Sequence, residues 1–301
     1  MAAPKLGELR PPVHRFVLGE FEVTTILDGA MVRDGICPPY GVGQEEAEVR
    51  ALARRNFLPD DRFENTFAPT LVNTGRELVL FDTGNGAGRR SSNAGFLRER
   101  LALAGYSPED VDVVAFTHMH PDHIGGVREG DDLAFPNARY AIGRHEFDAW
   151  SSGDRIPERR AANRRQFQDL IVPLAEMATF VEPGQDVVPG IRAVEAFGHS
   201  IGHLAFMIES NGAAVLLWGD ATNHYVLSLQ HPEWPAAMDD DREMAVATRK
   251  RILDMLATDR LLAIGHHMPF PAVGYVELGE IGYRWVPAAY QLRLPPRTSE
   301  Q

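Results

Sequence analysis

The short segment His-Met-His-Pro-Asp-His holds the side chains best suited to chemistry. It places His118, His120, Asp122 and His123 within six residues, in a chain that has eleven histidines. Imidazole nitrogens and carboxylate oxygens are ligands of divalent transition metals. Residues two apart on an extended chain point the same way, so His118 and His120 can reach one ion, whereas Pro121 turns the chain and redirects the other two. This geometry suits two adjacent metal ions better than an ordinary polar loop.

Each candidate ligand group follows an apolar run that is typical of a buried strand. Residues 111–116 form such a run directly before the histidine-rich segment. Three further groups follow the same rule: His199 comes after 191–197, Asp220 after 213–218, and His267 after 261–264. A strand end is a rigid place from which to hold a ligand, so we expect these side chains to gather at one edge of the sheets.

The remaining pattern predicts a mixed α/β protein of one domain over residues 1–301, with its core over roughly 14–290. Further strands are expected in a hairpin over 16–29 and at 66–73, 77–81, 139–142 and 204–209. Helices are expected at 45–55, 94–104, 144–150, 158–176 and 239–257. This order predicts two sheets packed face to face with helices outside. The irregular segment 32–61 is interpreted as a possible cap or dimer element.

Composition excludes several classes of partner. The chain has 30 basic and 42 acidic residues, a formal charge of -12, which disfavours nucleic acid and anionic membranes. Its single cysteine, Cys37, permits no internal disulfide, and we expect it only to fill space beside a turn. The beginning of the chain lacks the basic start and apolar run of a secretory signal, and no stretch is apolar enough for a membrane span. We therefore expect a cytoplasmic protein.

Together these residues predict a centre for two metal ions. Five imidazoles and two carboxylates could hold two ions roughly 3.5 to 4 Å apart, with one carboxylate between them and a bridging hydroxide. Such nitrogen-rich sites favour zinc, or iron, cobalt, nickel and manganese, over magnesium and calcium. The predicted ligands are His118, His120, Asp122, His123, His199, Asp220 and His267.

Four motifs carry a family resemblance that spans most of the chain. They are His118-x-His120-x-Asp122-His123, Gly198-His199, Gly219-Asp220 and His267-x-Pro-Phe-Pro. With them the sequence resembles the metallo-β-lactamase superfamily. The early Leu-Gly-Glu-Phe-Glu-Val-Thr and the late Gly-Tyr-Arg-Trp-Val-Pro resemble its methyl parathion hydrolase and lactonase branch in particular.

The resemblance implies an αββα sandwich and a protein that, like many of the family, is a homodimer. It also implies how the ligands are divided between the two metal ions. His118, His120 and His199 would hold one metal, Asp122, His123 and His267 the other, and Asp220 would bridge them. His203, the second histidine of Gly-His-x-x-Gly-His, is expected to support the site without ligating. His266 competes with His267 for the last position, and the spacing to Pro-Phe-Pro favours His267. Asp82 is expected to support a ligating ring through its other nitrogen, and His14, His145, His224 and His231 are expected to have no part in the site.

The predicted reaction is hydrolysis of a neutral, ester-like small molecule by the bridging hydroxide. Asp122 or Asp220 could move the proton. The best candidates are a lactone of the acyl-homoserine type and an organophosphate triester, with Trp150, Phe147 and Phe167 as substrate contacts. Alternatives are a glyoxalase II-like thioesterase, whose basic glutathione-binding tail is not recognisable here, and a non-catalytic or redox-sensing metal protein. A β-lactamase is disfavoured because, by family analogy, those enzymes carry cysteine or serine where this chain has Asp220.

Overall fold

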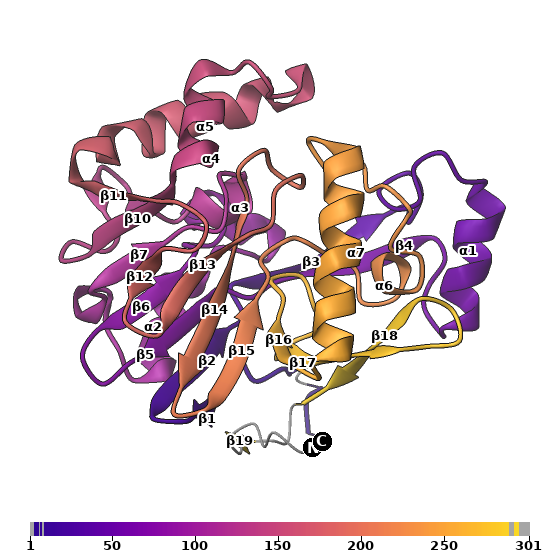
Figure 1. The fold of residues 1–301 in the computed structure, drawn as a ribbon, viewed down its shortest axis with the longest axis horizontal. Helices are drawn as coiled ribbons and strands as arrows, with labels where there is room; N and C mark the ends of the chain where they lie inside the picture. The colour runs from indigo at the N-terminus through magenta and orange to yellow at the C-terminus, as the bar shows by residue number, and fades with distance from the viewer. Residues whose placement is uncertain (1–2, 6, 8, 289–291, 295–301) are drawn as a thin grey trace.

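The computed structural model describes residues 3–5, 7, 9–288 and 292–294, and it stacks two β-sheets face to face (Figure 1). The first sheet consists, in spatial order, of β11 (Ala178–Val181), β10 (Arg139–Gly143), β7 (Val113–Ala115), β6 (Leu78–Phe81), β5 (Thr70–Asn73), β2 (Phe21–Ile26), β1 (Val13–Leu18) and β19 (Arg293–Leu294). The second consists of β12 (Asp186–Val188), β13 (Ile191–Glu195), β14 (Leu204–Ser210), β15 (Ala213–Leu217), β16 (Leu262–Ile264), β17 (Val273–Leu278) and β18 (Tyr283–Pro287).

Three hydrophobic cores separate four layers. The inner core joins the two sheets, where the rings of Phe81 and Phe206 have centroids 4.9 Å apart. A second core packs the outer face of the first sheet against α2 (Leu97–Leu101), α4 (Arg144–Ser152) and α5 (Ala161–Leu170). A third packs the second sheet against α7 (Arg242–Thr258), which Figure 1 shows lying across its outer face. The predicted αββα layering is confirmed.

The strand before the histidine-rich segment, β7, is buried because both of its faces are covered. β7 is hydrogen-bonded in parallel to β6 on one side and β10 on the other, and all three of its residues are buried. Such strands are continuous apolar runs rather than alternating ones. The chain leaves β7 and turns into the short helix α3 (Pro121–Ile124), where Pro121 occupies the first turn, a position that tolerates its missing N–H. The ligand segment therefore begins from the rigid centre of the sheet.

The segment predicted as a cap or dimer element forms a small layer of its own. The strands β3 (Gly29–Asp34) and β4 (Arg62–Phe67) pair with each other, and α1 (Glu46–Arg55) lies between them in the chain. Their apolar side chains share a core with residues around α6 (Leu227–Gln230). The short elements that complete the chain are η1 (Ala87–Ser92), η2 (Ala102–Ala104), η3 (Pro108–Asp110), β8 (Arg128–Glu129), β9 (Asp132–Leu133), η4 (Glu158–Arg160) and η5 (Val172–Met177).

Some predicted boundaries were wrong. The strand expected over 66–73 is two strands, β4 and β5, because the chain crosses between sheets at Ala68 and Pro69. The helix expected over 158–176 is broken into η4, α5 and η5, and Pro173 lies at the start of the last piece. β17 and β18 were not predicted as strands. The predicted end of the core near residue 290 lies outside the described residues. Within the part of the chain that the structure describes, no helix has both the length and the apolar character to cross a bilayer.

Candidate metal centre

The seven predicted ligands meet at one place, although they come from four separate parts of the chain. The segment after β7 supplies four of them, and the loops after β13, β15 and β16 supply one each. Two groups result, in each of which one nitrogen or oxygen atom per residue lies within 4.8 Å of the others: His118, His120 and His199 form the first, and Asp122, His123, His267 and the neighbouring His266 form the second. A third set, His118, His123 and Asp220, meets the same criterion and joins the two groups.

The first group is a compact set of three buried imidazoles. Nδ1 of His120 lies 3.0 Å from Nε2 of His118 and 3.0 Å from Nε2 of His199. Three ring nitrogens that converge in this way present lone pairs toward a common point. These are the three side chains predicted to hold one metal ion.

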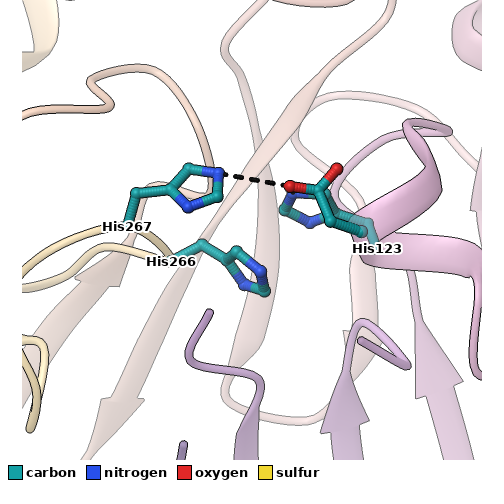
Figure 2. Close-up of side chains that lie close together, drawn as sticks. His123, His266 and His267 are labelled. Carbon is teal, nitrogen blue, oxygen red and sulfur yellow. Dashed lines mark ion pairs between the residues drawn. The ribbon is translucent and has the colours of Figure 1, made fainter. Parts of the chain in front are cut away.

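The second group brings one carboxylate and three imidazoles together. Figure 2 shows His123 from α3 facing His266 and His267, which come from the loop after β16. Nε2 of His267 lies 3.5 Å from a carboxylate oxygen of Asp122. This is the set predicted to hold the other ion, with His266 beside it.

Asp220 lies between the two groups. One of its oxygens, Oδ2, is 2.9 Å from Nε2 of His267 and 3.2 Å from Nε2 of His199. The other, Oδ1, is 3.3 Å from Nε2 of His123. Its carboxylate therefore touches imidazoles of both groups, which is the position that a bridging ligand needs.

Every predicted imidazole ligand is held by its outer nitrogen. A ring that donates one N–H to the protein keeps the lone pair of its other nitrogen for a metal. The outer contacts are His118 Nδ1 to Thr117 Oγ1 (3.0 Å), His120 Nε2 to Asp240 Oδ2 (2.9 Å), His123 Nδ1 to Asp82 Oδ2 (2.8 Å), His199 Nδ1 to Asp239 Oδ1 (3.0 Å) and His267 Nδ1 to the Thr66 carbonyl oxygen (2.8 Å).

Unpaired buried atoms indicate that the residues fit metal ions. Nε2 of His123, Oδ1 of Asp220 and Nε2 of His266 are buried and have no hydrogen-bond partner among the residues that the structure describes. Nε2 of His123 and Oδ1 of Asp220 lie 3.3 Å apart, but their geometry is not that of a hydrogen bond. A buried polar atom without a partner is costly unless something else satisfies it. Divalent transition-metal ions match both the nitrogen-rich donor set and these unpaired atoms.

Burial and local charge keep His118 and His120 neutral. Burial, followed by the neighbouring His123, lowers the pKa of His118 well below its ordinary value. Burial and the Arg160 guanidinium lower the pKa of His120 to about 3, against the opposing effect of Asp240. A neutral imidazole has the free lone pair that metal binding requires.

Carboxylates have the opposite effect on His199. Burial alone would lower its pKa, but Asp220 and Asp239 outweigh burial and raise the pKa to about 9. For a carboxyl group burial acts in the other direction and would raise the pKa of Asp122, but His123 and other imidazoles hold this pKa at about 2. Without metal, this centre therefore holds ionised carboxylates beside a protonated ring, and metal binding must displace protons.

The two residues predicted to support the site lie next to it. Besides holding His123, Asp82 accepts hydrogen bonds from the N–H and hydroxyl of Thr117, at 2.8 and 2.9 Å. His203 donates from Nδ1 to the Ala196 carbonyl oxygen, and its Nε2 accepts the backbone N–H of Asp220 at 3.0 Å. Both residues fix the orientation of ligand-bearing segments.

Three supporting residues were missed at the sequence level. Asp239 and Asp240 hold His199 and His120, and the fully buried Arg249 donates to Asp239 Oδ2 at 2.9 Å. The available signal was the run of aspartates at the start of the helix expected over 239–257. In the structure only Asp241 caps α7, by accepting the N–H of Met244. The two aspartates before it face the metal centre instead.

Of the two adjacent histidines at 266 and 267, His267 is better oriented to ligate. Its Nδ1 is held by Thr66 and its Nε2 faces Asp220. His266 instead lies against the His123 ring in a tilted arrangement, with centroids 4.1 Å apart and planes 36° apart. The preference for His267 stays a prediction that agrees with this geometry.

The aromatic residues predicted to contact substrate have another role. Trp150 and Phe167 have no exposed surface, and the Trp150 indole donates to Ser200 Oγ at 3.0 Å. Phe147 packs against Phe167 and Phe180 in the core beneath α4 and α5. A side chain without exposed surface cannot touch a substrate, so the prediction was wrong for Trp150 and Phe167 in this structure.

A cavity of about 420 Å³ opens beside the metal centre instead. His267 forms part of its wall, so a molecule in the cavity lies next to the second group. Most of the lining is apolar, and eight of the twelve lining residues belong to β3, β4 and the chain between them. The lining residues are Val32, Ile36, Leu58, Pro59, Arg62, Phe63, Glu64, Thr66, His224, Tyr225, His267 and Pro269.

Comparison with known proteins places this geometry in context. The family model of the metallo-beta-lactamase superfamily matches residues 69–266. The N-acyl homoserine lactonase of Bacillus cereus is 30% identical over 169 residues, which cover 55% of this chain and 60% of that protein. The N-acyl homoserine lactonase AiiA of Bacillus thuringiensis subsp. kurstaki is 29% identical over the same length. The matches thus span about 60% of the length of these curated relatives.

Solved structures match over more of the chain. AidC, a dizinc quorum-quenching lactonase in complex with a product N-hexnoyl-L-homoserine, superposes with a TM-score of 0.86 at 27% identity, over 92% of this chain and 98% of that one. The hydrolase AbOPH of the beta lactamase superfamily gives a TM-score of 0.84 over 93% and 98%. Its identity is 23%, so that likeness concerns the fold alone.

Proposed function

Because the chain belongs to the metallo-β-lactamase superfamily, we propose that it is a metal-dependent hydrolase that opens the lactone ring of N-acyl homoserine lactones. The observation that carries the proposal is the apolar cavity of about 420 Å³ with His267 in its wall. An acyl-homoserine lactone is a neutral ester with an apolar chain, so its chain suits this lining while its ring lies near the metal centre. The likeness to N-acyl homoserine lactonases supports the same substrate class.

The residues present fit two divalent transition-metal ions, with zinc as the first choice. His118, His120 and His199 would hold one ion, Asp122, His123 and His267 the other, and Asp220 would bridge them. When bound, such ions lower the pKa of water so that hydroxide is available near neutral pH, and they polarise a carbonyl group.

The protein's own side chains would direct the proton. Hydrolysis forms a bond from the water oxygen to the carbonyl carbon, breaks the ring C–O bond, and transfers a proton to the departing alkoxide. Among the proposed ligands Asp122 has a partly exposed side chain, at 25%, whereas that of Asp220 is 4% exposed. We assign the proton transfer to Asp122 and the fixed bridging position to Asp220. The product is the open hydroxy acid.

The test is ring opening of N-decanoyl-homoserine lactone by purified, zinc-loaded protein. We expect turnover that disappears when a chelator removes the metal and returns when zinc is added. A phosphotriester, a glutathione thioester and a β-lactam serve as competing substrates. A higher kcat/KM on any of these would contradict the proposal, and zinc binding without turnover on any substrate would indicate a non-catalytic metal protein.

Three expectations from the sequence stay predictions. They are organophosphate triester hydrolysis, a homodimeric state and a cytoplasmic location.

A further inference from the structure

His224 places a polar group in the apolar cavity. It follows Asp220 by four residues, its side chain is 5% exposed, and it forms part of the cavity wall. Its ring lies flat against Tyr225, with centroids 5.0 Å apart and planes 8° apart, and meets Tyr40 edge-on at 4.9 Å. The two aromatic neighbours fix the plane of the imidazole. From the sequence, this histidine was expected to have no part in the site.

Backbone contacts decide which nitrogen of His224 carries the proton. The N–H groups of Val226 and Leu227, where α6 begins, both donate to Nδ1, at 3.1 and 3.2 Å. A nitrogen that accepts hydrogen bonds has no proton, so the hydrogen of the neutral ring lies on Nε2. Burial also lowers the pKa of His224 to about 3, which keeps the ring neutral at physiological pH. Nε2 is therefore the donor of the ring, and the hydrogen bonds of His224 within the described residues involve only Nδ1.

The other polar groups of the cavity wall are mostly committed elsewhere. The Thr66 hydroxyl donates to the Met268 carbonyl oxygen, and the Thr66 carbonyl oxygen accepts from His267. Glu64 pairs with Arg10 at 2.7 Å. Arg62 is largely exposed beside Asp61. His224 thus contributes a hydrogen-bond donor to the wall of a cavity whose lining is otherwise mainly apolar.

An acyl-homoserine lactone has one strong acceptor between its ring and its apolar chain, the amide carbonyl oxygen. We propose that His224 donates a hydrogen bond from Nε2 to this oxygen and so selects lactones that carry an N-acyl amide. This inference rests on the proposed lactonase function and deepens it. A site built to hydrogen-bond a substrate group rejects analogues without that group, because its donor is then left unpaired.

Two variants separate the donor from the structural role of the ring. In His224→Asn the side-chain oxygen can still accept the backbone N–H groups, but the Nε2 donor is lost. In His224→Gln an amide N–H can reach the position of Nε2. The substrates are N-decanoyl-homoserine lactone and a γ-alkyl lactone of similar length that lacks the amide. Tyr225→Phe removes the hydroxyl of the neighbouring cavity residue and tests whether that group, rather than His224, recognises the amide.

We expect His224→Asn to raise KM for the amide-bearing lactone about tenfold, which is the effect of one lost hydrogen bond. The KM for the alkyl lactone should stay unchanged. His224→Gln should recover most of this loss, and Tyr225→Phe should leave the ratio between the substrates unchanged. Zinc content, measured on the same samples, should not differ.

Other results would overturn the inference. An equal loss on both lactones would give His224 a purely structural role, and no change in any variant would exclude the hydrogen bond. A shift of the ratio in Tyr225→Phe alone would assign the recognition to Tyr225. Wild-type protein that opens neither lactone would refute the proposed function itself, whereas wild-type turnover on both with an unaltered ratio in His224→Asn refutes only the role of His224.

Discussion

The metal centre and the wall of the cavity differ in how they are held, although His267 belongs to both. In the centre, each proposed imidazole ligand has an outer partner, and the carboxylates Asp82, Asp239 and Asp240 provide three of these partners. The wall comes largely from β3, β4 and the chain between them, where side chains such as Leu58 are only partly buried. One region is fixed by directional hydrogen bonds and charge, and the other by apolar shape.

This difference separates reactivity from selectivity. A ligand set that is fixed from outside tolerates little change, because each lost contact leaves a buried charge or donor unpaired. An apolar wall can change its shape at a smaller cost. Changes in the centre should therefore affect all substrates alike, whereas changes in the wall should depend on the acyl chain.

The largest effect should follow Asp220→Ala. Asp220 contacts imidazoles of both groups, so its loss removes the proposed bridge and leaves His199 and His267 without their shared carboxylate. Since even outer partners of metal ligands are worth 10- to 100-fold, we expect kcat/KM to fall more than about 100-fold for every lactone, with loss of bound zinc. Assays combined with elemental analysis check this. Wild-type rates with full metal content would refute the bridging assignment.

Removing Arg249 tests whether the support of the centre is part of the core. Arg249 and Asp239 are both fully buried and joined at 2.9 Å. Arg249→Met leaves the Asp239 carboxylate without its cation, so we expect unfolding free energy to drop by about 3–5 kcal/mol in urea titrations. Arg251→Met on the same helix is the control and should change it by less than about 0.5 kcal/mol, since Arg251 is exposed. Equal effects of the two variants would contradict a special role for the buried pair.

The contrast between the two regions also explains what the sequence could predict. The seven candidate ligands could be proposed from the sequence because each of the four segments that carry them follows an apolar run, and strand ends meet at a sheet edge. The spacing of His118 and His120 alone predicts that both can reach one ion. The layers were predictable for the same reason, since buried strands such as β7 are continuous apolar runs.

The parts that could not be predicted depend on contacts between distant segments. An acidic run before a helix is compatible with a helix cap, and only folding turns Asp239 and Asp240 toward the imidazoles while Asp241 caps α7. The cavity is likewise built from distant segments, because β3, β4 and the chain between them meet the loops that carry His224 and His267. Trp150 looked like a wall residue because aromatic side chains serve equally well in a core, which is where it lies.

Asp240→Ala should have an intermediate effect on metal affinity. Asp240 accepts from His120 at 2.9 Å and is held by Arg160 at 2.8 Å, so its loss frees the His120 ring. We expect zinc to bind 10- to 100-fold more weakly, measured by competition with a chromophoric chelator. Asp241→Ala is the matched control, because it should cost about 1 kcal/mol of stability as a lost helix cap without changing zinc affinity. Equal zinc affinities in the two variants would contradict the supporting role of Asp240.

The smallest effect should come from the wall. Leu58 is half-buried in the cavity lining, so Leu58→Ala removes apolar surface from the proposed chain-binding site. At about 0.8 kcal/mol per buried CH₂, with only part of the side chain buried, we expect KM for N-decanoyl-homoserine lactone to rise roughly fivefold and KM for the N-butanoyl lactone to stay unchanged. Phe57→Ala is the control, since the adjacent Phe57 is 97% exposed and outside the lining. If both acyl chains lose equally, the cavity does not hold the chain, and selectivity lies in the metal centre after all.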